Sequence, residues 1–205
     1  MKRFLSVLFL TLLSHLFLFA TQSLGKLDFL RCEYLVTPLG VDVPTPRFSW
    51  RLPAHLNKQQ AYQVIVGTDS VAVANGTGGA WDSGKVLSSE VLTVYAGKAM
   101  QPYTRYYWKV SVWDDANNNY TSAVSHFETG LMGMHNWKGS WISDTHDYRL
   151  KPAAYFRKAF DAGRKIRQAR AYIAVAGLYE LSINGTRVGD HRLDPAYTRF
   201  DRRTL

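Results

Sequence analysis

The sequence has a single cysteine, Cys32, so no disulfide can form within the chain. Disulfide-stapled folds are therefore excluded, and packing and hydrogen bonds must hold the structure together. Arg31 stands directly before Cys32, which argues against a lipid-modified cysteine. A small apolar residue in a strand-like segment is typical of a protein interior. We therefore expect Cys32 to be buried in the first strand.

Helical periodicity is also missing, because no stretch of about ten residues carries apolar side chains along one helical face. Instead, apolar and polar residues alternate along residues 47–52, 62–66 and 105–113. The breaks between such segments are rich in Gly, Pro, Asn and Asp, which favour turns. Roughly seven short strands in about 100 residues, without a disulfide, are typical of an immunoglobulin-like or fibronectin type III sandwich. The sequence predicts an all-β chain.

Only one long apolar run occurs, Phe4 to Ala20, and the cations Lys2 and Arg3 precede it. Small residues follow the run, as they do in a secretory signal peptide. We therefore expect residues 1–25 to be a signal peptide and the mature chain to be secreted or periplasmic, with no membrane contact beyond that segment. The run is close to the shortest length that spans a bilayer, so an uncleaved N-terminal anchor is the alternative.

Acidic residues are few, with 16 Asp plus Glu against 25 Lys plus Arg, and the formal net charge is +9. The cationic excess is concentrated in residues 149–205. Such a surface attracts nucleic acid or acidic polysaccharide through its electric field. The cations are interleaved with predicted strands, however, and no recognition helix accompanies them. We interpret them as a solvated surface and expect no nucleic-acid partner, and a basic polyanion binder is the alternative.

The predicted strands form two groups, separated by the glycine-containing segment Gly130–His135. We expect a fibronectin type III-like domain over residues 26–131, a linker over 132–136 and a second β domain over 137–205. The second group of strands is expected at 138–143, 153–160, 168–176, 179–183 and 186–193.

A hairpin is the clearest feature of the second group. Tyr179, Leu181 and Ile183 alternate with polar residues, which is strand periodicity. Asn184-Gly185 then supplies the two positive φ angles that a type I′ turn requires, and the return strand is expected from Thr186. Because such a hairpin has open edges that need further strands, we expect the second domain to be incomplete within this sequence.

These segments also carry a family resemblance. Residues 171–190, followed by 193–201, are similar to the N-terminal β-sandwich of bacterial α-L-rhamnosidases. Upstream blocks resemble the same family in the same order, so the resemblance covers residues 28–205. The upstream blocks are 46–52, 61–66, 81–84, 106–114, 127–130, 137–142 and 155–160.

The resemblance implies two consecutive β-sandwich domains, the first fibronectin type III- or immunoglobulin-like and the second a truncated, jelly-roll-like sandwich. It implies that the chain is the secreted, non-catalytic N-terminal portion of a glycoside hydrolase that removes terminal α-L-rhamnose with inversion. The family's catalytic carboxylates lie in a later (α/α) barrel, so no catalytic residue is assigned here. Expected partners are rhamnose-containing glycans and that downstream barrel. We expect these 205 residues alone to hydrolyse nothing.

A self-standing secreted carbohydrate-binding or adhesion protein is the alternative from a different functional class. Sugars stack on exposed aromatic rings, and Trp50 and Trp108 lie on the apolar side of their strands, where we expect core residues. Trp113 lies on the opposite, polar side of its strand. It is therefore a candidate carbohydrate-binding residue under either interpretation.

Some relatives of the second domain bind sugar with the help of calcium, as the resemblance implies. The oxygen-bearing residues nearest the resembled motif are Asn184, Asp190 and Asp194, which are further candidate carbohydrate-binding residues. No metal ligand or cofactor is assigned, and calcium is the one ion that the resemblance suggests. Residues 114–119 lack the spacing of a calcium loop and predict a hairpin turn. Residues 143–147 hold Asp144, His146 and Asp147 but lack a second histidine for a metal site.

Overall fold

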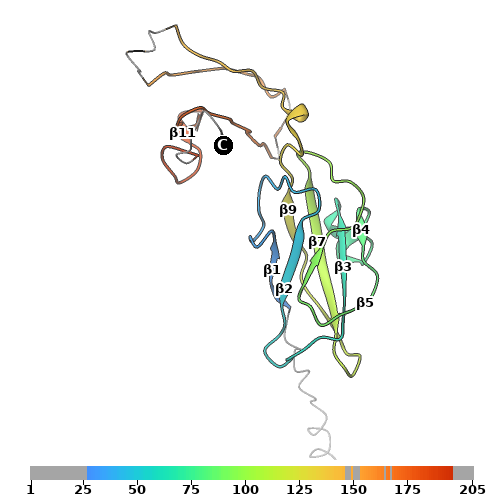
Figure 1. Ribbon diagram of the computed structural model, residues 1–205. Coiled ribbons are helices and arrows are strands. Elements are labelled where there is room, and N and C mark those ends of the chain that lie inside the picture. The colour runs from blue at the N-terminus through green and yellow to red at the C-terminus, as the bar shows by residue number, and fades with distance from the viewer. Residues whose placement is uncertain (1–26, 146–148, 150–152, 164, 167, 196–205) are drawn as a thin grey trace, which may run out of the picture. The chain divides into compact units, whose positions relative to one another are not determined.

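The computed structural model describes residues 27–145, 149, 153–163, 165–166 and 168–195. The chain divides into two compact units, at residues 1–141 and 142–205 (Figure 1). The predicted signal peptide lies outside the described residues, as do His146, Asp147 and residues 196–205. Within the described part of the chain, no helix combines the length and the hydropathy needed to cross a membrane.

The first unit is built from two antiparallel sheets. A three-stranded sheet has the order β1-β2-β6, and a six-stranded sheet has the order β4-β3-β7-β8, with β5 also paired to β3 and β9 to β7 (Figure 1). The smaller sheet consists of β1 (Asp28–Cys32), β2 (Arg47–Arg51) and β6 (Leu92–Val94). The larger sheet consists of β3 (Ala61–Gly67), β4 (Trp81–Asp82), β5 (Val86–Leu87), β7 (Arg105–Trp113), β8 (Asn119–Thr121) and β9 (Ser125–Glu128).

Short helical turns are confined to connections between strands. The helix α2 (Ser70–Ala74) follows β3, and the 3-10 helix η1 (Met134–Asn136) follows β9. All other elements among the described residues are strands. The all-β class and the immunoglobulin-like first domain are therefore confirmed, and the narrower assignment to fibronectin type III stays a prediction.

The central strand of the larger sheet is β7. Strand β3 pairs with it along the whole length of β3, from Ala61 opposite Trp113 to Gly67 opposite Tyr107. Its buried and half-buried residues alternate strictly, as strand geometry requires when one face packs on a core. The alternation predicted over residues 105–113 is confirmed.

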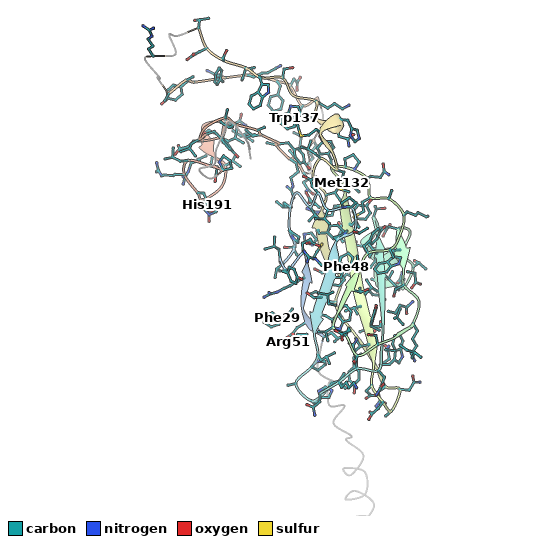
Figure 2. The ribbon with its side chains drawn as sticks, in the orientation of Figure 1. Phe29, Phe48, Arg51, Met132, Trp137 and His191 are labelled. Atoms are coloured by element: carbon teal, nitrogen blue, oxygen red, sulfur yellow. The ribbon has the colours of Figure 1, made fainter. Side chains whose placement is uncertain are left out.

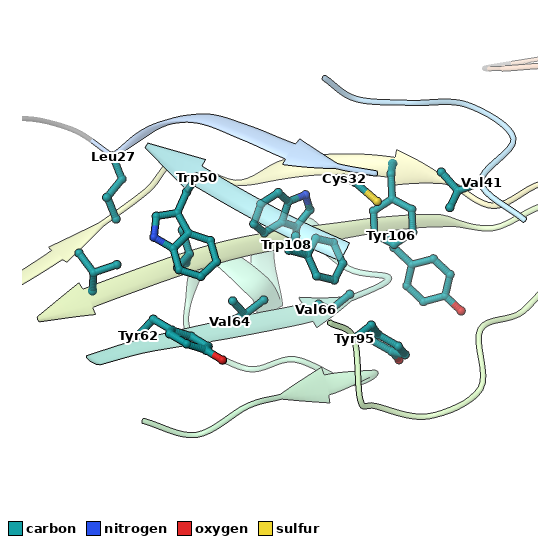
Figure 3. Packing of buried hydrophobic residues seen from close by; sticks show 14 of the residues in the cluster. Leu27, Cys32, Val41, Trp50, Tyr62, Val64, Val66, Tyr95, Tyr106 and Trp108 are labelled. Carbon is teal, nitrogen blue, oxygen red and sulfur yellow. The ribbon is translucent and has the colours of Figure 1, made fainter. Parts of the chain in front are cut away.

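The core lies between the two sheets and is dominated by aromatic side chains, with Trp50 and Trp108 among them (Figure 3). Phe48 of β2 has its ring centroid 4.6 Å from that of Trp108 and 5.7 Å from that of Phe127. Cys32 is 1% exposed, and burial, with the neighbouring Glu33 charge, raises the pKa of its thiol to about 12. The burial predicted for Cys32, Trp50 and Trp108 is confirmed.

A buried glutamine links the strands around this core. The Gln59 side chain is fully buried, and its Oε1 accepts a hydrogen bond of 2.9 Å from Trp50 Nε1. Its Nε2 donates to the Glu90 carbonyl at 2.6 Å. The other core indole differs, because Trp108 Nε1 is buried without a hydrogen-bond partner. Gln59 thus fixes β2 to the segment before β6 by polar contacts, while Trp108 is held by packing.

Two arginines of β2 hold the edge strand β1 and the turn that follows it. Arg51 makes two hydrogen bonds of 2.9 Å to Asp28, and its guanidinium lies 3.5 Å from the centroid of the Phe29 ring (Figure 2). Arg47 repeats the arrangement on the next acidic–aromatic pair, Glu33 and Tyr34: its Nη2 lies 2.6 Å from Glu33 Oε2 and its guanidinium 4.6 Å from the Tyr34 ring. Both aromatic residues have positive φ, 49° at Phe29 and 64° at Tyr34. We call these two groups the arginine clamps.

The second unit contains the predicted hairpin. Strand β10 (Ser182–Ile183) pairs with β11 (Thr186–Arg187), and φ is 50° at Asn184 and 79° at Gly185. Two consecutive positive φ angles in a two-residue loop define the I′ type, so the predicted turn is confirmed. Its strands are shorter than predicted, and beyond them a single bridge joins Tyr179 to Asp194.

Three other predicted strands are wrong. Residues 138–143, 153–160 and 168–176 have no strand structure. They are rich in apolar residues, but no partner strand lies beside them in the described part of the chain, and an extended segment without a partner forms no ladder. The predicted domain limits at 131 and 137 stay predictions, and η1 lies within the predicted linker.

Candidate functional site

Trp113 occupies the last position of β7 and faces away from the core. Its backbone carbonyl accepts a hydrogen bond of 2.7 Å from the Gln60 backbone N–H, and its Cα is paired with those of Ala61 on β3 and Asn119 on β8. The strand's alternation puts Val112 in the core and leaves Trp113 half-buried. The predicted placement of the Trp113 indole on the outer face of the sheet is confirmed.

An open hollow of about 340 Å³ lies beside Trp113. It is formed where the start of β3, the segment around β5 and the turn after β7 converge. Its lining combines one aromatic ring, one exposed aliphatic side chain, two amides, one ammonium and two carboxylates. The lining residues are Gln60, Ala61, Lys85, Leu87, Trp113, Asp114, Asp115 and Asn117.

Lys85 lies over the indole within this hollow. Its Nζ is 4.5 Å from the centroid of the Trp113 ring and donates a hydrogen bond of 2.7 Å to Asn117 Oδ1. A cation over an exposed indole is stabilised by about 0.5–1 kcal/mol. The ammonium is therefore held over the ring by one cation–π contact and one hydrogen bond.

The turn after β7 is organised by Asp114. Its Oδ1 accepts from the Asn118 backbone N–H at 2.8 Å, and its Oδ2 accepts from Asn118 Nδ2 at 2.9 Å and from the Tyr120 hydroxyl at 3.1 Å. These hydrogen bonds, the side-chain bond from Asn118 first, hold the pKa of Asp114 below its usual value. Asn117 has a φ of 61°, which asparagine tolerates in turns. The hairpin turn predicted for residues 114–119 is confirmed, and Asp114 is a structural carboxylate committed to it.

Two polar side chains of the hollow remain uncommitted. In the described part of the chain, neither the Gln60 amide nor the Asp115 carboxylate makes a side-chain hydrogen bond, and both residues are exposed. They offer donor and acceptor atoms beside an aromatic ring. An aromatic face bordered by free hydrogen-bonding groups is the arrangement that a sugar ring requires.

The remaining predicted site residues lie on the second unit and do not converge. Asn184 is at the tip of the hairpin, where it forms the turn. Asp190 lies beside His191 at an exposed position, with 3.1 Å between Oδ1 and Nδ1. Asp194 is paired through its backbone with Tyr179. Among the described residues, no hydrogen bond joins the side chains of these three positions to one another.

These positions do not fit a calcium ion. Calcium takes six to eight oxygen ligands at about 2.3–2.6 Å, and no group of three His, Cys, Asp or Glu residues gathers anywhere in the described ranges. The Asn184 side chain is at a turn, and Asp190 is directed to a histidine.

Two of the three glutamates of the first unit, Glu33 and Glu128, are bound by arginine side chains. Glu33 is bound by Arg47, whose side-chain hydrogen bond holds the pKa of Glu33 below its usual value. Glu128 is bound by Arg105, with Arg105 Nε 2.7 Å from Glu128 Oε1. A general acid in glycoside hydrolysis needs a raised pKa, whereas Glu33 has the opposite shift.

Lys85, Gln60 and Leu87 belong to the hollow but were not identified from the sequence. Lys85 is 32 positions from its partner Asn117, and no local pattern connects the two. The signal that could have found them is the pairing of β3 with both β5 and β7, which puts Leu87 and Trp113 opposite the same residue, Ala61.

Comparison with known protein families gives two matches. Residues 27–133 match the model described as "Rha78A-like, N-terminal immunoglobulin domain", and residues 164–205 match the "Alpha-L-rhamnosidase N-terminal domain". The matches follow one another in the order that the sequence blocks predicted.

Individual relatives and solved structures similar to this chain are α-L-rhamnosidases as well. The chain is 34% identical to an α-L-rhamnosidase of Formosa agariphila, over 80% of this chain and 20% of the relative. Among solved structures, an α-L-rhamnosidase from Dictyoglumus thermophilum superposes with a TM-score of 0.75 at 44% identity, over 84% of this chain and 22% of that one. A Streptomyces avermitilis α-L-rhamnosidase complexed with L-rhamnose gives a TM-score of 0.54 at 41% identity, over 58% and 12%. The chain thus spans about one fifth of the length of the curated relatives it matches.

Proposed function

Because this chain belongs to the α-L-rhamnosidase family, as its N-terminal region, we propose that it is the non-catalytic N-terminal part of an enzyme that hydrolyses terminal α-L-rhamnosyl residues. The observation that carries the proposal is the ordered match of two successive family domains, residues 27–133 and 164–205. The relatives that match are named α-L-rhamnosidases, and one was solved with L-rhamnose. Rhamnose-containing glycans are accordingly the proposed substrates of the whole enzyme.

The proposed role of these residues is to support a downstream catalytic barrel and to hold substrate near it. Two features of the carboxylates favour a structural role for these residues over a catalytic one. Glu33 and Glu128 are bound by arginines in the β-sandwich, and Asp114 is committed to its turn. A carboxylate fixed by cationic or amide donors stays ionised, which suits a structural contact and not a proton donor.

Export is part of the proposal. It is supported by the order of Lys2, Arg3 and the apolar run from Phe4 to Ala20, which is typical of a signal peptide. Mass spectrometry of the protein from culture medium or periplasm tests it. Cleavage between residues 20 and 25 is expected, and an intact N-terminus in a membrane fraction would favour the anchor instead.

The activity is tested by comparing two proteins on an aryl α-L-rhamnoside. The 205-residue chain is expected to give no turnover above a no-protein control. The product of the complete coding sequence is expected to release the phenol, with an inverted sugar product. A complete product without rhamnosidase activity would contradict the proposal, as would activity that stays with the 205-residue chain through purification.

A carbohydrate-binding or adhesion protein without an enzyme is the second candidate. The hollow at Trp113 favours it, because a sugar site on the first unit would need no barrel. A stop codon directly after Leu205 would support this candidate, and a long reading frame with helical-hairpin periodicity would support the hydrolase.

A further inference from the structure

We propose that the hollow at Trp113 is a binding subsite for a neutral 6-deoxyhexose, in which Lys85 is a displaceable cover of the indole. The ligand class rests on the proposed function, while the site itself rests on the geometry of the first unit. The subsite lies on the immunoglobulin-like domain and involves none of the hairpin residues of the second unit.

The indole supplies the stacking surface. Trp113 ends β7, and its backbone is fixed by a 2.7 Å hydrogen bond from the Gln60 N–H and by pairing with Ala61 and Asn119. Because strand pairing fixes the backbone at Trp113 before a ligand arrives, little backbone ordering is needed on binding. The C–H face of a pyranose matches such a flat apolar surface.

The polar groups around the ring select hydroxyl ligands. The Gln60 amide offers both donor and acceptor atoms, and the Asp115 carboxylate is an acceptor without a described partner. The hollow holds one cation, Lys85, and two carboxylates, Asp114 and Asp115. This local excess of negative charge disfavours uronic acids and other anionic sugars, so a neutral sugar is expected.

Leu87 favours a deoxy sugar. Its side chain is 84% exposed on β5 and lines the same hollow as Trp113. The methyl group of a 6-deoxyhexose can cover this aliphatic surface, whereas a 6-hydroxyl group in its place gains nothing from it. Burying one methyl group corresponds to about a fourfold gain in affinity.

Lys85 occupies the ring face that the sugar would use. Its Nζ is 4.5 Å from the ring centroid and is held in addition by a single hydrogen bond to Asn117. Displacing an exposed cation from an indole lowers the apparent affinity about two- to fivefold. Removal of this ammonium is therefore expected to strengthen sugar binding. If Lys85 instead bound the sugar directly, its removal would weaken binding.

The test is a titration of the 205-residue chain with methyl α-L-rhamnopyranoside, followed through the indole N–H signals by NMR. We expect the Trp113 signal to shift and saturate. Methyl α-L-mannopyranoside, which differs only by the 6-hydroxyl group, should bind about fourfold more weakly, and a methyl glucuronide should bind more weakly than both. No shift at Trp113, or tighter binding of the glucuronide, would overturn the proposal.

Variants locate the site. Trp113→Ala should weaken binding at least about tenfold, as loss of a stacking ring does, while Trp141→Ala, at a tryptophan that is 70% exposed, should leave it unchanged. Lys85→Met, at an exposed position that is safe for folding, should strengthen binding about two- to fivefold. Wild-type affinity in Trp113→Ala would overturn the subsite. Unchanged or weaker binding in Lys85→Met would overturn the role of Lys85 as its cover. Rhamnosidase activity of the complete product is measured separately, so failure of this subsite leaves the proposed enzyme standing.

Discussion

The two units of this chain both contain apolar-rich segments that predict strands, with opposite outcomes. In the first unit, alternation along β7 buries Trp108 completely between two sheets. In the second, residues 153–160 have no strand structure, and Tyr155 is 99% exposed and Phe160 77% exposed. Apolar composition is a property of a few neighbouring residues, whereas burial needs a second sheet from elsewhere. The difference shows that such a segment forms a strand only where a pairing partner exists.

The largest effect that this comparison predicts is at Trp108. Trp108→Ala should lower the free energy of unfolding of the first unit by about 3–5 kcal/mol, because it opens a cavity beside Phe48. Phe160→Ala is the matched change on an exposed aromatic and should stay within about 0.5 kcal/mol. Urea unfolding followed by amide NMR of β7 measures both. Equal destabilisation by the two variants would show that Phe160 is packed after all.

Gln59 provides the next test, because it is a polar residue at the core of the well-packed unit. Gln59→Ala removes the acceptor of Trp50 Nε1 and the donor to the Glu90 carbonyl. Leaving buried polar groups unpaired should cost about 1–3 kcal/mol. Its exposed neighbour is the control, and Gln60→Ala should change stability by less than about 0.5 kcal/mol. Comparable melting curves for the two variants would contradict the structural role of Gln59.

The turn at Gly185 tests whether the second unit has any defined local structure. Gly185→Val forces a β-branched residue to a φ of 79° and should destabilise the hairpin by about 1–2 kcal/mol. Gly177→Val, at a glycine without positive φ, is the control. Cross-strand NMR contacts between β10 and β11 should weaken only in the first variant, with β7 unchanged in both. If Gly185→Val left these cross-strand contacts unchanged, the assignment of a tight turn at Asn184-Gly185 would be wrong.

The smallest expected effect is at the arginine clamp of Glu33. Because the Arg47 hydrogen bond lowers the folded-state pKa of Glu33, its stabilisation is present above the unfolded value of about 4.3 and is lost as pH falls through the folded value. Glu33→Gln should therefore cost about 0.2–1 kcal/mol at pH 7, and the difference from wild type should vanish in acid. Thermal melts of both proteins from neutral pH downward measure it. A difference that grows with acid would reverse the assigned sign.

What could be predicted from the sequence was what neighbouring residues determine. Strand β7, the burial of Cys32 and Trp50, and the Asn184-Gly185 turn all follow from residue type and short-range order. The family resemblance is confirmed by the two domain matches, since an ordered series of blocks is also a property of sequence alone.

What could not be predicted depends on partners distant in sequence. Arg51 and Asp28 are 23 positions apart, and Lys85 and Asn117 are 32 apart. Trp113 could be assigned to the outer face by alternation, but nothing local indicates that an ammonium covers its ring. The strand predictions for the exposed segments of the second unit were wrong for the same reason. The sequence of a segment does not show whether another strand lies beside it to pair with.

The arginine clamps have a consequence for self-association. Strand β1 is the outer strand of its sheet, and a regular outer strand is a template on which another chain can add a strand. Its pairing with β2 shifts register between Asp28 and Arg31, and Phe29 adopts a left-handed conformation under Arg51. An incoming strand would meet an interrupted row of hydrogen-bonding groups flanked by guanidinium charges. The irregularity of β1 therefore disfavours edge-to-edge pairing of one copy of the chain with the next.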